Sequence, residues 1–156
     1  LESEVKIMLT DRLYFHNSFA ILKSHINTYQ FLGKDIGNRA PAHAPEFSSH
    51  AALEYKGDDG FFIRLEHNYT HDFYYEDQYD FQSDPYQIIN SSIGYSYKKI
   101  KISTWIRNLL DERYVKRSYH FAVEPTPNQP EEPFKSKSYF SFGDLRQFGV
   151  TISYGM

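Results

Sequence analysis

The sequence contains no cysteine, which excludes disulfide bridges, a thiolate nucleophile and a cysteine-based zinc site. No run of about 18 apolar residues occurs, so a transmembrane helix is excluded as well. The formal net charge of −3 provides no basic field that would recruit nucleic acid. The first residues, Leu1 to Glu4, lack both an initiator Met and the basic start and apolar core of a signal peptide. We therefore expect a chain that has lost its front or is a piece of a longer one.

Motifs of known catalytic chemistry are also missing. There is no Gly-x-Ser-x-Gly elbow, no glycine-rich phosphate loop and no defensible pair of catalytic carboxylates. The richest group of metal-ligand types lies between His67 and Phe81, but His67 and His71 are four residues apart. On a strand that spacing separates them by about 13 Å, so it does not suit a shared metal. We predict no enzyme, no catalytic residue, no metal site and no cofactor.

Aromatic residues and period-two alternation are abundant instead. The chain has 14 Tyr and 13 Phe. In the clearest segment, Phe61, Ile63 and Leu65 alternate with polar side chains such as Arg64 and Glu66, as in a strand with one apolar face. About six such strands are expected, near residues 4–9, 51–56, 61–69, 89–97, 100–107 and 145–156. Residues 13–28 are rich in aromatic and aliphatic side chains and offer an ambiguous seventh strand, whose faces the pattern does not assign.

The connections between these segments alternate in length. Short ones lie near residues 10–12, 57–60 and 97–99, and long ones near 30–47, 71–85 and 115–142. Outer-membrane barrels combine short periplasmic turns with long extracellular loops, whereas a soluble sandwich has no general reason to do so. The pattern favours antiparallel transmembrane β-barrel strands. A soluble β-sandwich or lipocalin-like barrel remains the alternative.

Three motifs resemble the TonB-dependent outer-membrane receptors. "ISTWIRNLLDERYV" (102–115) is similar to their penultimate strand, "FGDLRQFGVTISYGM" (142–156) to their final strand, and "GNRAPAHAP" (37–45) to a loop two hairpins upstream. The sequence departs from the family at Met156, where these receptors tend to end in Phe or Trp. It departs again at Asp144 and Leu145, where a Pro often precedes the Arg.

The resemblance implies an all-β fold in which residues 1–156 form the C-terminal part of a barrel of about 22 strands. No counterpart of the family's plug domain is found in the sequence. The implied location is the bacterial outer membrane, with the C-terminus periplasmic. The implied partners are the N-terminal remainder of the barrel and its plug, TonB through that missing part, and lipid or lipopolysaccharide; no nucleic acid is expected.

The implied function is uptake of a bulky, scarce nutrient such as an iron chelate, haem, cobalamin or a glycan. Two alternatives are left open. One is a soluble β-barrel or sandwich that binds a ligand through its aromatic loops. The other is a structural barrel component of a multi-chain outer-membrane complex that transports nothing.

The barrel interpretation assigns a position to three groups of residues. The residues expected to face the barrel lumen are Arg64, Glu66, Lys101, Trp105 and Arg107. The loop residues expected to contact a ligand are Tyr74, Tyr75, Tyr79, Tyr119 and His120. The residues expected to face lipid are Ile63, Leu65, Ile93, Ile102, Ile106, Val150 and Ile152.

Overall fold

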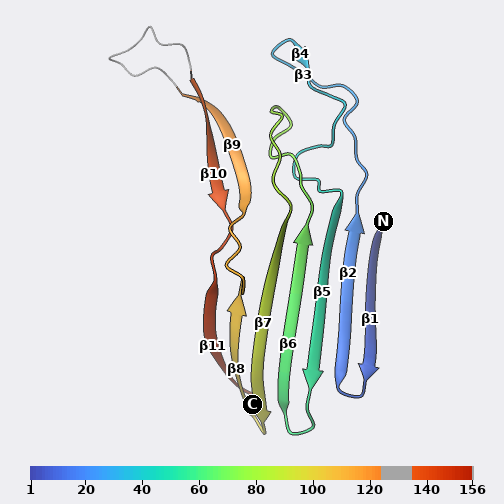
Figure 1. The fold of residues 1–156 in the computed structure, drawn as a ribbon, viewed down its shortest axis with the longest axis vertical. Helices are drawn as coiled ribbons and strands as arrows, with labels where there is room; N and C mark the ends of the chain where they lie inside the picture. The colour runs from blue at the N-terminus through green and yellow to red at the C-terminus, as the bar shows by residue number, and fades with distance from the viewer. Residues whose placement is uncertain (124–134, 156) are drawn as a thin grey trace, which may run out of the picture.

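A computed structural model describes residues 1–123 and 135–155 as an all-β chain. Seven strands form one antiparallel sheet in the order β1-β2-β5-β6-β7-β8-β11, and β9–β10 and β3–β4 form separate two-stranded hairpins (Figure 1). The elements are β1 (Glu2–Thr10), β2 (Leu13–Ile21), β3 (Gln30–Phe31), β4 (Lys34–Asp35), β5 (Phe47–Lys56), β6 (Phe61–Thr70), β7 (Tyr86–Tyr97), β8 (Ile100–Arg107), β9 (Val115–Val123), β10 (Lys135–Phe142) and β11 (Gln147–Tyr154). Among the described residues no helix is long and apolar enough to cross a membrane.

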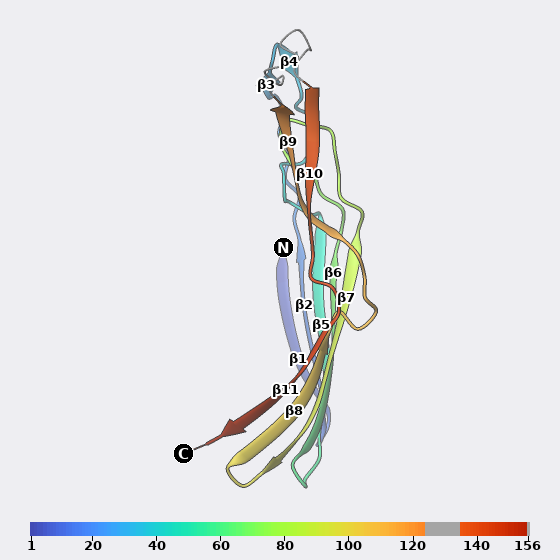
Figure 2. The same cartoon turned by 90° about the vertical axis from the view of Figure 1, so that its left-hand side faces the viewer.

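The sheet is a single curved layer, as the side view shows (Figure 2). Because no second layer covers it, only Ala52, Phe73 and Tyr75 are buried hydrophobic residues in the described part of the chain. Two of these three lie in a loop rather than in the sheet. The two-layered sandwich that the sequence left open is therefore not formed.

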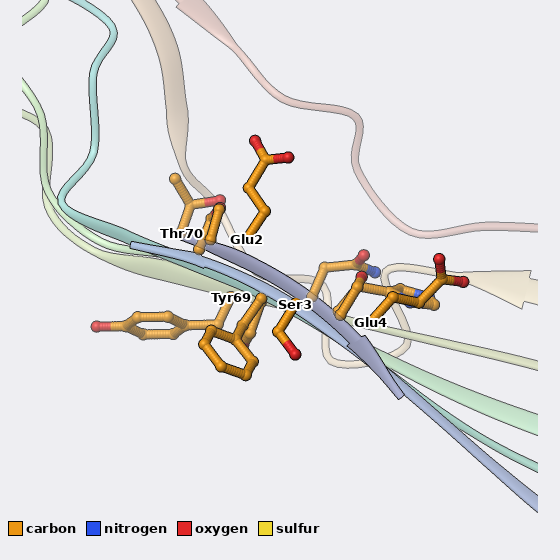
Figure 3. A pocket seen from close by; sticks show the side chains of 12 residues that line it. Glu2, Ser3, Glu4, Tyr69 and Thr70 are labelled. Carbon is orange, nitrogen blue, oxygen red and sulfur yellow. The ribbon is translucent and has the colours of Figure 1, made fainter. Parts of the chain in front are cut away.

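The sheet has an apolar face and a polar face. Residues directly opposite each other on neighbouring strands point to the same face, so the strand register shows which side chains lie together. On the apolar face, Leu53 pairs with Leu65, Ile63 with Ile93, and Ile102 with Ile152. On the polar face, Glu54 pairs with Arg64, Ala52 with Glu66, and Lys101 with Ser153. The alternation is visible on β1 and β6, where Glu2 and Thr70 point to one side of the sheet and Ser3 and Tyr69 to the other (Figure 3).

Aromatic rows flank the aliphatic middle of the apolar face. Near the long loops, the rings of Phe19 and Phe47 lie 6.4 Å apart and those of Phe47 and Tyr69 5.9 Å apart. At the other end, Tyr55 and Phe61 lie 6.3 Å apart. The 10 residues of β6 span this band, which matches the about 9–11 residues of a tilted membrane-crossing strand.

The tight turns lie at one end of the sheet and the long connections at the other (Figure 1). Gly60 has a φ of +94° in the turn between β5 and β6, and its carbonyl accepts a bond from the Ser96 N–H at 2.9 Å. A Cβ on Gly60 would lie 2.1 Å from the Ser96 carbonyl oxygen. Only glycine therefore allows this turn to approach β7 so closely.

One segment that the sequence left ambiguous is a strand, and one expectation is wrong. The sheet has the six expected strands and a seventh, β2, formed by residues 13–21. Its pattern is hidden because polar Asn17 lies on the apolar face, while Tyr14 and Ala20 lie on the polar face. The expected loop at 115–142 is instead the β9–β10 hairpin. The tip of that segment, residues 124–134, lies outside the described residues.

Candidate functional site

The long connections meet around one buried arginine of the "GNRAPAHAP" segment. The Arg39 side chain is only 8% exposed. Its guanidinium donates bonds of 2.9 Å to the carbonyls of Tyr79 and Glu76 and a further bond to that of Asp77. The guanidinium carbon also lies 4.6 Å from the centre of the Tyr74 ring. Arg39 thus holds the 71–85 loop against the 22–46 loop.

Local backbone geometry positions this arginine. A Cβ on Gly37 would lie 2.4 Å from the Asn27 carbonyl oxygen, so glycine allows the two segments to pack. Asn38 takes a left-handed φ of 59°, which asparagine tolerates better than most residues. The Asp35 carboxylate accepts bonds from the N–H groups of Gly37 and Tyr29, and these bonds lower the pKa of Asp35.

Replacing Arg39 with alanine is expected to release the 71–85 loop. The change would leave three carbonyl groups without their charged donor, at a cost of about 1.5–3 kcal/mol. Hydrogen–deuterium exchange of amides 74–82 should become faster. Arg113 is exposed, so Arg113→Ala is the matched control and should leave that exchange unchanged. Equal exchange in Arg39→Ala and the unaltered protein would contradict this role.

The β9–β10 hairpin packs on the same 71–85 loop through His120. The backbone N–H of His120 donates to the Glu76 carboxylate at 2.6 Å, and its ring lies 4.1 Å from the Tyr79 ring. The His120 Nδ1 also lies 2.9 Å from the Ser138 hydroxyl. The structure therefore brings together Tyr79 and His120, two of the five loop residues singled out from the sequence.

Tyr75, another of those five, is buried in an aromatic cluster. It is 5% exposed, and its ring lies between Phe73 at 5.5 Å and Phe81 at 5.4 Å. Its hydroxyl donates to the Val115 carbonyl at 3.2 Å. Burial raises the pKa of Tyr75, with a smaller contribution from the nearby Asp84 carboxylate. The phenol is therefore a neutral donor that ties the loop to β9.

A hollow of about 650 Å³ opens between the loops and β9, within the size range of about 300–1,000 Å³ typical of ligand pockets. Tyr119, which was singled out from the sequence, lines it and is 43% exposed. The other residues that line it include Tyr29, His43, Tyr75, Glu76, Asp77 and Arg117. Phenols, an imidazole, a guanidinium and two carboxylates can together stack on and hydrogen-bond a polar aromatic molecule.

Sequence reasoning missed Tyr29, His43 and Arg117 as members of this hollow. Tyr29 and His43 belong to the 22–46 connection. In that connection the sequence was compared with the receptor family only at the "GNRAPAHAP" motif, and no side chain was assigned a binding role. Arg117 was hidden in the segment taken for a loop. The ligand-contacting roles of Tyr74, Tyr75, Tyr79, Tyr119 and His120 stay predictions.

The other two family-like motifs, at 102–115 and 142–156, are joined by hydrogen bonds where the sheet meets the β9–β10 hairpin. We call this group of contacts the latch. Asn108 is 2% exposed, and its Nδ2 donates to the carbonyls of Glu112 at 2.9 Å and Asp144 at 3.0 Å. The Asp111 carboxylate accepts the Arg146 N–H at 2.9 Å. These bonds join "NLLDERY" to "GDLR" where the β8–β11 ladder stops.

A glycine and two tyrosines complete the latch. The Tyr86 and Tyr114 rings stack 4.3 Å apart. A Cβ on Gly143 would lie 2.0 Å from the Tyr114 ring, so glycine leaves the space that this ring fills. The Gly143 N–H donates to the Tyr114 carbonyl at 2.9 Å.

Replacing Asn108 with alanine should destabilise the assembled barrel by about 1–3 kcal/mol, because buried carbonyl and N–H groups lose their partner. Thermal unfolding of the assembled protein measures this. Asn27 is exposed, so Asn27→Ala removes the same amide from an open site and should shift the midpoint little. An Asn108→Ala midpoint matching that of Asn27→Ala would show that the latch contributes no stability.

The polar face carries a chain of ion pairs on β1, β2, β5 and β6. Arg64 lies 2.7 Å from Glu66 and 3.8 Å from Glu54, which in turn lies 3.2 Å from Lys56. His50 lies 3.7 Å from Glu66. Further along, the His16 ring lies 5.6 Å from the His50 ring and 3.0 Å from the Glu4 carboxylate. Lys6 lies 2.8 Å from Glu4.

The remaining residues expected in the lumen lie on β8. Lys101 Nζ is 4.4 Å from the centre of the Phe62 ring, and Arg107 Cζ is 5.0 Å from the centre of the Trp105 ring. The Trp105 indole N–H donates to the Thr151 hydroxyl at 3.2 Å. Arg64, Glu66, Lys101, Trp105 and Arg107 therefore share one face of the sheet. Their exposure to a barrel lumen remains a prediction.

Comparison with solved structures shows that the sheet and its loops have the same fold as one part of two outer-membrane receptor chains. The siderophore receptor PiuA from Acinetobacter baumannii matches 98% of this chain with a TM-score of 0.76 and 15% identity. The ferric yersiniabactin uptake receptor FyuA from Yersinia pestis matches 98% with a TM-score of 0.72 and 18% identity. The chain spans 21% and 22% of those two chains.

The fold expected from the sequence is therefore confirmed. No protein-family model matches the sequence.

Proposed function

We propose that this chain is the C-terminal sector of a TonB-dependent outer-membrane receptor that takes up a bulky, scarce nutrient. The observation that carries the proposal is the single seven-stranded sheet, which has an uncovered apolar band on one face and ion pairs on the other. In a bilayer the apolar band faces lipid and lipopolysaccharide, and the polar face lines the lumen.

The two edge strands of the sheet, β1 and β11, each require a further barrel strand as a hydrogen-bonding neighbour. Neither β1 nor β11 has a second neighbour among the described residues. In lipid, unpaired N–H and C=O groups cost several kcal/mol each, so both edges must pair. The partner is the N-terminal remainder of the barrel, which carries the plug and the contact with TonB.

The nutrient class that best fits is an iron chelate. The names of the two matched receptors, for siderophores and for ferric yersiniabactin, favour it. The hollow beside Tyr119 and Arg117 supports it too, because aromatic rings and a guanidinium suit the aromatic and anionic groups of such chelates.

Uptake of radioactive iron tests this function. The iron is supplied with siderophores from the culture supernatant of the source strain, and cells carry either the unaltered receptor or the Arg117→Ala, Tyr119→Ala double variant. We expect severalfold lower uptake in the variant at equal amounts of receptor in the outer membrane. Equal uptake would contradict the binding role of the hollow. No uptake by either protein, with the barrel assembled, would support the non-transporting structural role instead.

The proposed topology puts the long connections outside the cell and the tight turns and C-terminus in the periplasm. A cysteine replacing Lys34, at the tip of β3–β4, should react with a membrane-impermeant maleimide on intact cells. A cysteine replacing Asp59, in the turn between β5 and β6, should react only after the outer membrane is breached. The opposite pattern would reverse the topology.

A further inference from the structure

Polar side chains interrupt the apolar face on β2 and β6. Asn17 of β2 and His67 of β6 both lie opposite Ala51 of β5. His67 is two residues, or about 7 Å of strand, from Leu65, which stands midway between the two aromatic rows. Both polar side chains therefore lie inside the band that the proposed function places in the bilayer.

The hydrogen-bonding groups of these two side chains are only partly satisfied. The Asn17 Nδ2 donates to the His50 carbonyl at 3.2 Å, and the His67 Nε2 lies 3.0 Å from the Gln87 Oε1. Within residues 1–123 and 135–155, neither side chain makes another hydrogen bond, so the Asn17 Oδ1 and the His67 Nδ1 have no partner there. Lipid tails offer none, and polar groups left open in hydrocarbon are costly.

Between the two polar groups, β5 presents short side chains on the same face. Ala51 lies between Asn17 and His67, and Ser49 occupies the next apolar-face position of β5 toward the long loops. Small residues on a membrane-facing surface leave room for another polypeptide to approach closely. We call Asn17, Ser49, Ala51 and His67 the membrane patch. It combines room for a neighbouring protein with polar groups that need one.

We propose that a second copy of the receptor packs on the membrane patch in the plane of the outer membrane. Two copies in one membrane have the same orientation, so each residue lies at the same depth in both. A two-fold axis along the bilayer normal near Ala51 therefore brings the polar groups of one copy to the depth of the same groups in the other. An amide and an imidazole each offer donors and acceptors, so the patch is complementary to itself. The proposal rests on the proposed function, since it requires this face to lie in the bilayer.

Cross-linking at Ala51 tests the proposal on the complete receptor in outer membranes. A residue close to a two-fold axis lies near its own counterpart, so Ala51→Cys should be joined to itself by a membrane-permeant bismaleimide. A reagent with a span of about 10 Å matches the spacing of two facing sheets. Residues 1–156 contain no cysteine, and the unaltered receptor gives the background. A denaturing gel should show a product of twice the receptor's mass, and mass spectrometry should identify both linked peptides as the one that carries residue 51.

Three further variants sharpen the result. Ile102 also lies on the apolar face, but on β8, three strands from β5. That separation puts it about 14 Å from the axis and about 28 Å from its counterpart, so Ile102→Cys should give only the background. In the Ala51→Cys receptor, His67→Leu should lower the yield about three- to tenfold, because each copy loses a polar contact of modest strength. Ile93→Leu keeps an apolar group outside the membrane patch and should leave the yield unchanged.

Three outcomes would contradict the proposed packing of two copies. The first is an Ala51→Cys receptor that gives only the background, or is linked only to a different protein. The second is an equal yield for Ala51→Cys and Ile102→Cys, as random collision in the membrane would produce. The third is an unchanged yield after His67→Leu. Absence of the assembled barrel from the outer-membrane fraction would instead contradict the proposed function.

Discussion

Replacing Leu65 with arginine is expected to destabilise the assembled barrel by about 2–4 kcal/mol, the cost of a cation at the bilayer midplane. Leu65 lies on the apolar face opposite Leu53 and is 47% exposed. It stands four residues from both Phe61 and Tyr69, or about 13 Å of strand from each aromatic row. This central position makes it a better test than Ile152, which lies two residues from Tyr154 at the turn end.

Urea unfolding of the complete barrel in lipid vesicles measures this cost. Ser18→Arg places the same cation on the polar face, where Ser18 lies opposite Glu4, and should cost less than about 1 kcal/mol. Leu65→Met retains apolar volume at the original site and should cost about 1 kcal/mol or less. If Leu65→Arg were as stable as Ser18→Arg, the apolar face would not lie in lipid.

Replacing Val150 with proline is expected to prevent assembly of the barrel. The Gly155 N–H donates to the Lys99 carbonyl, on the side of β8. Antiparallel strands alternate the direction of their N–H groups. Thr151 and Ser153 therefore also face β8, whereas Val150 directs its N–H toward the open edge. Proline at residue 150 would remove a donor that the next barrel strand requires and leave a carbonyl unpaired in lipid, at several kcal/mol.

The amount of folded barrel in the outer membrane, judged by its heat-modifiable gel mobility, measures this effect. Val150→Ala keeps the N–H and should cost at most about 1.6 kcal/mol in lost apolar contact. An exposed edge strand tolerates proline where the N–H points to solvent. Normal assembly of Val150→Pro would therefore show that β11 needs no further neighbour.

The sequence predicted those parts of the fold in which side-chain alternation is regular. β6 and the β7–β8 hairpin follow their pattern closely, and the pairing of β11 with β8 follows from their order along the chain. The faces of β2 were not assigned because "FAILK" (19–23), at the end of this strand, breaks strict alternation. The β9–β10 hairpin was missed because the prolines of the segment between them favoured a loop.

The candidate site was harder to predict because its organising contacts involve the main chain. Arg39 binds three carbonyl groups, and no pattern of side-chain types reveals such partners. Aromatic composition did indicate that Tyr79, Tyr119 and His120 belong to the loop end. It could not distinguish buried Tyr75, which fastens β9, from exposed Tyr119.

The latch at Asn108 has a mechanical consequence. The ladder between β8 and β11 ends at Arg107 and Gln147, and the one between β9 and β10 begins at Val115 and Phe142. Side-chain bonds from Asn108 and Asp111, together with one main-chain bond from the Gly143 N–H to the Tyr114 carbonyl, take the place of regular ladder bonds across this gap. The outer hairpin is therefore held at its base by these few bonds and further out by the 71–85 loop, which it contacts through Tyr75, Glu76 and Tyr79. A load applied to the hairpin reaches the sheet through both attachments. A substitution at Asn108 weakens the first attachment while every bond of the seven-stranded sheet stays in place.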